Sequence, residues 1–148
     1  GLHLLADNQP HRLGVLSFYI EGLHYNLAVR LLNDRFGIQS RGGCSCAGTY
    51  GHILLNVDEE TSQQITCQID AGDLSNKPGW VRASLHPTMT DDEVVYVARA
   101  IHEVMRHYDE WKRDYVFDPA SGEFNPREPL PPPIGLDTFD PVPDAPTR

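Results

Sequence analysis

The chain is poor in positive charge. Its 148 residues include 12 lysine or arginine residues against 21 aspartate or glutamate residues, so the formal net charge is -9. Surfaces that bind nucleic acid or dock on anionic membranes normally carry clustered basic residues. We therefore expect neither nucleic acid nor a membrane surface to be a partner of this protein.

Long apolar runs and a disulfide framework are also missing. No stretch of about 18 consecutive apolar residues occurs, which excludes a transmembrane helix, and no signal peptide is recognisable at the N-terminus. The cysteines number three, an odd count, and Cys44 and Cys46 are too close in sequence to bridge each other comfortably. We therefore expect a reducing, cytoplasmic setting.

The 12 prolines are unevenly distributed along the chain, and most of them follow residue 117. That C-terminal segment is acidic and contains only two basic residues, Arg127 and Arg148. We expect residues 1–116 to form the folded domain and residues 117–148 to form a proline-rich acidic tail that is extended or disordered. Within the tail, the run PLPPP at 129–133 suits a polyproline II segment, so a partner-docking domain is one hypothesis.

Apolar periodicity predicts an α+β fold. Strands are predicted at residues 13–20, 38–41 and 80–85, and helices at 24–36, 58–70 and 90–114. Thr90 and Glu93 form a capping box at the start of the last helix. We expect a small antiparallel or mixed sheet of about three strands, covered by helices on one face. The first strand is almost wholly apolar, which predicts burial on both faces or nearly so.

Two features of the sequence suggest chemistry. Cys44 and Cys46 lie on a glycine-rich loop after Arg41, whose charge could favour a thiolate; space-filling by small side chains is the alternative. Arg82 lies inside an otherwise apolar strand and needs a partner, because a buried unpaired charge is costly. That partner is either a ligand carboxylate, an acidic side chain of the chain itself, or solvent at an edge strand.

A metal site built from thiols is a further alternative. Cys44, Cys46 and Cys67 could bind zinc together with His52, but the C-x-C spacing lacks the usual zinc knuckle. We therefore predict no metal ligands.

Three segments, taken in order, resemble the C-terminal small domain of class V aminotransferases of the cysteine desulfurase and selenocysteine lyase type. They are RLGVLSFYIEGLHYN (12–26), FGIQSRGGCSCAG (36–48) and KPGWVRASLHPTMTDDEVVYVARAI (77–101). The resemblance implies a pyridoxal phosphate (PLP) enzyme of fold type I. It also implies a small amino-acid substrate, with PLP and its Schiff-base lysine in a separate large domain, and a homodimer as the full-length enzyme.

The same resemblance implies roles for individual residues. Cys46 matches the persulfide-forming cysteine, Arg82 the arginine that binds the substrate carboxylate, and Arg41 the arginine at the start of the cysteine loop. Cys44 is an extra thiol that could serve as an auxiliary group. It and Ser45 stand where desulfurases often carry two histidines.

Neither of the two lysines, Lys77 and Lys112, matches the Schiff-base position. The resemblance therefore implies a C-terminal piece of a larger lyase or transferase that is inactive alone. Another class V activity that does not need Cys46 (a transaminase, epimerase or kynureninase-like hydrolase) and a stand-alone thiol sulfur-acceptor or metal-binding module are the alternatives.

Overall fold

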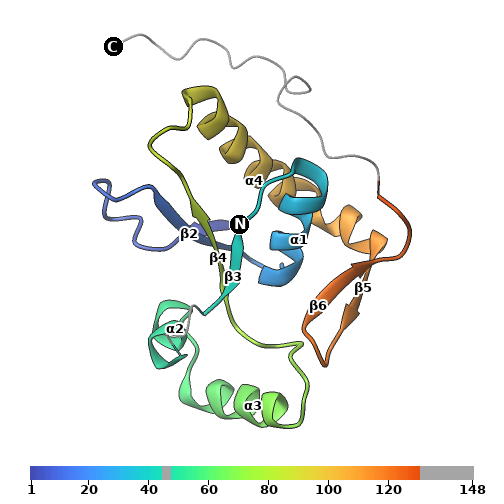
Figure 1. Cartoon of the computed structure of the whole chain (residues 1–148). Helices are drawn as coiled ribbons and strands as arrows, with labels where there is room; N and C mark the ends of the chain where they lie inside the picture. Colours follow the sequence, from blue (N-terminus) through green and yellow to red (C-terminus); the bar gives the residue numbers. More distant parts are fainter. Residues whose placement is uncertain (45–47, 131–148) are drawn as a thin grey trace.

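The computed structural model of the chain describes residues 1–44 and 48–130 (Figure 1). Its strands are β1 (Leu2–Leu4), β2 (Val15–Ile20), β3 (Arg41–Gly43), β4 (Trp80–Ser84), β5 (Tyr115–Asp118) and β6 (Glu123–Pro126). Its helices are α1 (Tyr25–Phe36), α2 (Gly48–Leu54), α3 (Glu59–Asp70) and α4 (Asp91–Trp111), followed by the short 3-10 helix η1 (Lys112–Asp114). No helix in the described part of the chain has the length and hydropathy needed to cross a membrane.

The main sheet has four antiparallel strands in the order β1-β2-β4-β3, which confirms the predicted α+β class. The additional strand, β1, comes from the N-terminal segment and pairs with β2 along its outer edge. At three residues it is too short to give a periodic signal in the sequence.

The core lies between one face of this sheet and the helices α1 and α4 (Figure 1). Phe18 of β2 and Val81 of β4 are direct cross-strand neighbours, and both are buried against Leu31 of α1 and Val104 of α4. Successive side chains of a strand point to opposite faces. Arg82, next to Val81, therefore points to the face that is turned away from these helices.

The prediction that the first strand is buried on both faces or nearly so was wrong. Val15 of β2 is 41% exposed, and Leu13, just before the strand, is 86% exposed. The alternate residues Phe18 and Ile20 are buried. The apolar run correctly indicated a strand. However, the face of β2 opposite Phe18 and Ile20 is only partly covered by the described residues.

Capping residues mark the helix boundaries, and the predicted Thr90–Glu93 capping box is confirmed. Gly37 takes the left-handed conformation (φ 66°) that ends α1, and the Thr90–Glu93 capping box opens α4. The Asp58 carboxylate accepts a hydrogen bond from the Thr61 amide at the start of α3.

The expectation of an extended or disordered tail from residue 117 does not hold for residues 117–126. These residues complete the hairpin β5–β6, and the proposed boundary falls inside β5. Asp118 and Gly122 form its turn, with Gly122 at φ 71°, and Phe124 packs against the core. The sequence signal was an aspartate and a glycine flanked by aromatic residues, which is typical of a turn between strands. Residues 131–148 of the predicted tail lie outside the described part.

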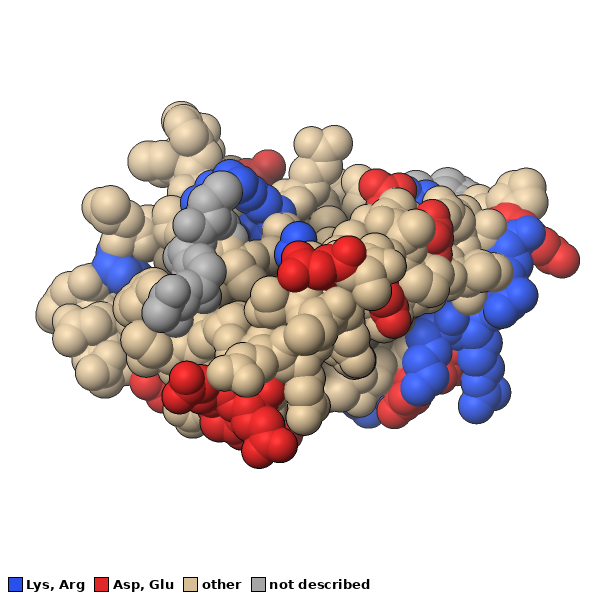
Figure 2. Space-filling view, turned by 90° about the horizontal axis from the view of Figure 1, so that it is seen from below, with Lys and Arg blue, Asp and Glu red and all other residues tan. Residues whose placement is uncertain are grey.

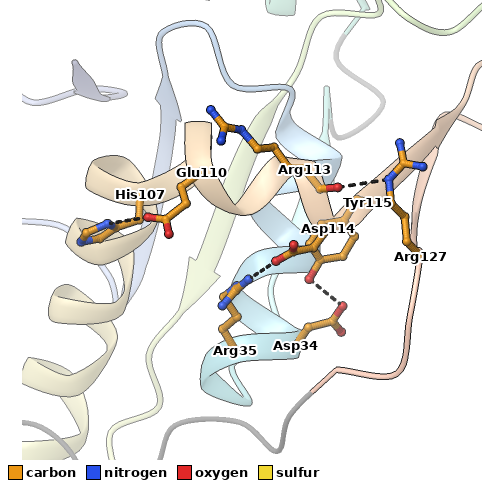
Figure 3. Close-up of polar contacts among 8 residues, drawn as sticks. All are labelled: Asp34, Arg35, His107, Glu110, Arg113, Asp114, Tyr115 and Arg127. Atoms are coloured by element: carbon orange, nitrogen blue, oxygen red, sulfur yellow. Dashed lines mark hydrogen bonds and ion pairs between the residues drawn. The ribbon is translucent and has the colours of Figure 1, made fainter.

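Polar contacts join the start of this hairpin to α1 (Figure 3). The buried Tyr115 hydroxyl donates to Asp34, 3.2 Å away, and Arg35 pairs with Asp114 at 2.6 Å. Burial, together with the Asp34 carboxylate, raises the pKa of Tyr115. The phenol therefore stays protonated and acts as a hydrogen-bond donor that holds β5 against α1.

A histidine caps α1 where it meets the hairpin. The His24 Nδ1 accepts a hydrogen bond from the Asn26 amide at 3.2 Å, and the His24 ring lies 5.4 Å from the rings of Phe117 and Phe124. Burial lowers the pKa of His24 below its usual value of 6.5. A protonated Nδ1 has no lone pair with which to accept this bond.

We predict that His24 makes the stability of the protein depend on pH. Below about pH 6.5 the unfolded chain takes up a proton that the native His24 resists, so stability present above that pH is lost as pH falls. The free energy of unfolding, measured with urea, should be lower at pH 5 than at pH 7.5. The part of this decrease that depends on His24 should be about 0.5–2 kcal/mol, the usual contribution of an N-cap. His24→Asn, which caps without titrating, should remove this component, and His11→Asn should keep it. An unchanged pH dependence in His24→Asn would contradict the prediction.

Candidate functional site

The two arginines singled out from the sequence lie side by side on the sheet. Arg41 of β3 and Arg82 of β4 are direct cross-strand partners, and Ser17 of β2 flanks Arg82 on its other side. These three residues define what we call the arginine face, which is the face turned away from α1 and α4. Two residues that are 41 positions apart in the sequence are thus brought together by strand pairing.

Neither arginine is neutralised within the described ranges. The ion pairs found there involve neither guanidinium. Arg41 is exposed, whereas Arg82 is half-buried and its Nε is a buried nitrogen with no hydrogen-bond partner among the described residues. Like charges directly opposite each other destabilise a sheet, and a buried charged donor without a partner is costly. An anion bound on this face would relieve both costs.

This concentration of positive charge stands out in an acidic chain. Figure 2 shows acidic side chains spread across this view of the molecule, with basic ones at one end and in smaller groups elsewhere. Arg30 and Arg35, by contrast, each form an ion pair with an aspartate, Asp34 and Asp114 respectively. The composition of the arginine face suits the recognition of a carboxylate or phosphate, because guanidinium donors match the oxygens of either group.

Glycines and one tyrosine place the short edge strand β3. The strand was predicted at residues 38–41, but in the structure it spans Arg41–Gly43, so the prediction was wrong for residues 38–40. A Cβ on Gly42 would lie 2.7 Å from the Tyr25 ring, and one on Gly79 would lie 2.6 Å from it. The buried Tyr25 ring therefore occupies space that any other residue at these two positions would fill. The sequence shows the two glycines, Gly42 and Gly79, but it does not show that both face the same aromatic ring. Only the fold identifies that ring as Tyr25.

The first thiol of the loop is in a protected environment. The half-buried Cys44 Sγ donates a hydrogen bond to the Pro78 carbonyl at 2.8 Å. A Cβ placed on Gly51 of α2 would lie 3.4 Å from this sulfur. Burial raises the pKa of the Cys44 thiol, and the charge of Lys77 opposes this only in part. Cys44 thus links the start of the loop to the segment before β4, and it is not activated as a nucleophile.

The other predicted thiol, Cys46, lies outside the described residues. Cys67 is exposed on α3, and His52 is hydrogen-bonded to the Ser62 hydroxyl at 2.8 Å. Within residues 1–44 and 48–130, no three His, Cys, Asp or Glu side chains are grouped as metal ligands. The described part of the chain therefore offers no support for the zinc alternative.

The two lysines do not form a site for PLP with the arginine face. Lys112 lies at the end of α4 and pairs with Asp109, one turn earlier. Lys77 lies in the turn that leads into β4, where its backbone amide donates to the Leu74 carbonyl. PLP enzymes hold the cofactor through an aldimine lysine and a partner for the pyridinium nitrogen. Within residues 1–44 and 48–130, Lys112 is already paired with Asp109 and no ion pair joins Lys77 to an acidic partner, so these residues do not fit that requirement by themselves.

Comparison with known proteins identifies one family. The model of the aminotransferase class-V family matches residues 1–97, which is more than half of the chain and includes both arginines of the arginine face. No curated protein matches the chain. The match ends within α4, so the hairpin β5–β6 lies beyond the matched residues.

We predict that Cys44 reacts slowly with alkylating agents. In a Cys46→Ser variant only Cys44 and Cys67 remain. At pH 7.5, iodoacetamide should modify the exposed Cys67 at least about tenfold faster than Cys44, because burial raises the pKa of Cys44, which lowers its thiolate fraction, and also restricts access to it. Mass spectrometry of time points gives both rates, and urea should make them similar. Equal rates in the folded chain would mean that Cys44 is an accessible, activated thiol.

Proposed function

Because the chain belongs to the aminotransferase class-V family, whose members generally use PLP, we propose that it is the C-terminal part of a PLP-dependent enzyme that acts on a small amino acid. The proposed reaction is removal of sulfur or selenium from cysteine or selenocysteine. The observation that supports it most directly is the Arg41–Arg82 pair, two unneutralised cations side by side on one face of the sheet.

Arg82 is proposed to bind the substrate carboxylate. Its half-buried guanidinium has a fixed fork of donors, and its Nε has no partner among the described residues. A carboxylate would accept from this fork and hold the amino acid in one orientation. Arg41, exposed beside it, would add positive charge that attracts the anionic end of the substrate and favours a thiolate on the adjacent loop.

Cys46 is proposed to accept the sulfur. Its thiolate would form an S–S bond to the substrate sulfur as the substrate C–S bond breaks, leaving a persulfide on Cys46. The electron pair of the broken bond stays with the substrate carbon, which is then protonated. PLP, when bound, supplies an electron sink for such chemistry. The part of the enzyme that holds PLP is proposed to be a separate domain, so this chain alone would be inactive.

The proposed assembly is a homodimer in which each arginine face meets a PLP-bearing domain. The substrate would be enclosed between that domain and the sheet, and the carboxylate would be bound from the side of β3 and β4. Exclusion of water from such a space strengthens the ion pair with Arg82.

We predict that Arg82→Lys weakens substrate use in the complete enzyme. A lysine keeps the charge and loses the fork, so kcat/KM should fall about 10- to 100-fold, mainly through KM, since hydrogen bonds to charged groups contribute about 1.5–3 kcal/mol. Steady-state kinetics measure this. Arg106→Lys, an exposed substitution on α4, is the control and should leave kinetics unchanged. Wild-type kinetics in Arg82→Lys would remove this arginine from the site.

A second prediction separates sulfur transfer from the other reactions of the family. Cys46→Ser should abolish release of sulfide from cysteine while leaving binding of the amino acid, followed through the PLP absorption spectrum, intact. Cys67→Ser on α3 is the matched control and should retain activity. If Cys46→Ser keeps full turnover and Arg82→Lys does not, the enzyme carries out another class V reaction, such as transamination or epimerisation.

A further inference from the structure

We propose that a polar cavity between α1 and the C-terminal hairpin binds a small zwitterionic ligand of the size of an amino acid. The cavity has a volume of about 450 Å³, which is within the usual range for small-molecule sites. It is bounded by α1, by the segment that leads into β3, and by β6. It is distinct from the arginine face, because α1 lines the cavity and the arginine face is turned away from α1.

Arg30 of α1 is the basic residue of the cavity lining. Its Nε lies 2.7 Å from the Asp34 carboxylate, so its charge is already paired on one side. Asp34 is the only ion-pair partner of Arg30 in the described part of the chain, and it also accepts from the Tyr115 hydroxyl. The Arg30 side chain is 42% exposed whereas that of Asp34 is 9% exposed, so the guanidinium remains accessible from the cavity. Its remaining donors suit a ligand carboxylate.

Glu123 of β6 is the acidic residue of the lining, and its carboxylate takes part in none of the ion pairs among the described residues. Its direct cross-strand neighbour, Asp118, uses its own carboxylate to accept hydrogen bonds from the Ala120 amide and the Ser121 hydroxyl. A ligand ammonium would give the Glu123 carboxylate an ion-pair partner.

Neutral polar groups also line the cavity. Asn33 and Gln39 supply amides, and Ser40 contributes a buried hydroxyl that has no hydrogen-bond partner among the described residues. Buried polar groups in folded proteins are nearly always paired, so the unpaired hydroxyl beside a cavity marks a place where a partner is missing. Val29 and Phe124 supply apolar surface. A guanidinium, a carboxylate and two amides in one lining match a molecule with a carboxylate, an ammonium and a polar side chain.

The cavity adjoins the segment that leads into the arginine face. Gln39 and Ser40 lead directly into Arg41 of β3, and Asn26, on the cavity wall, donates to the Gly122 carbonyl of the hairpin turn at 2.6 Å. A bound ligand would therefore contact both the hairpin and the segment that positions Arg41.

The test is a titration of the 148-residue chain with L-glutamine and with L-serine, followed by backbone amide NMR shifts. We expect saturable binding of at least one of them, with the largest shifts at residues 39–40 and 123–124. N-acetyl-glutamine, which lacks the ammonium, and glutamine amide, which lacks the α-carboxylate, should bind at least tenfold more weakly.

Variants locate the ligand and distinguish this site from the arginine face. Glu123→Gln and Gln39→Ala should each weaken binding at least tenfold, while the exposed control Glu60→Gln should not. Arg82→Gln should leave binding unchanged. Loss of binding in Arg82→Gln with retention in Glu123→Gln would place the ligand on the arginine face and overturn the proposal while supporting the proposed function. No saturable binding of either amino acid would overturn it as well.

Discussion

The structure depends on the burial of one face of a small antiparallel sheet under two helices. Phe18 and Val81 pair across β2 and β4 and are covered by α1 and α4. Because side chains alternate along a strand, this burial sets which residues point the other way. A shift of register by one residue would move Arg82 into the apolar core, which makes the pairing strongly specified. The location of the candidate site is thus a consequence of core packing.

Arg41, the other arginine of the pair, lies on the edge strand β3. β3 is only three residues long, and it is held where Gly42 and Gly79 make room for the Tyr25 ring. Cys44, directly after the strand, is tied by its thiol to the Pro78 carbonyl. Packing and one hydrogen bond therefore place Arg41 opposite Arg82 despite their like charges. The cost of that placement is the physical reason to look for an anionic ligand.

The hairpin β5–β6 extends the folded domain beyond the part that matches the family. It is joined to α1 through Tyr115 and Asp34, through Arg35 and Asp114, and through packing of Phe124 near His24 (Figure 3). These contacts use polar groups of α1 that face away from the sheet. The helix therefore has two partners: the sheet on its apolar side and the hairpin on its polar side. The polar cavity lies where this second contact leaves space.

Sequence periodicity and capping signals were sufficient to predict the main helices and the two central strands. The apolar spacing of α1, the left-handed Gly37 and the capping box of Thr90 are local features, and local features depend on neighbouring residues alone. Arg82 stood out because it interrupts an apolar strand. The pairing of Arg41 with Arg82, the protected state of Cys44 and the return of the hairpin to α1 depended on the tertiary structure, because each joins residues far apart in sequence through packing that no local pattern specifies.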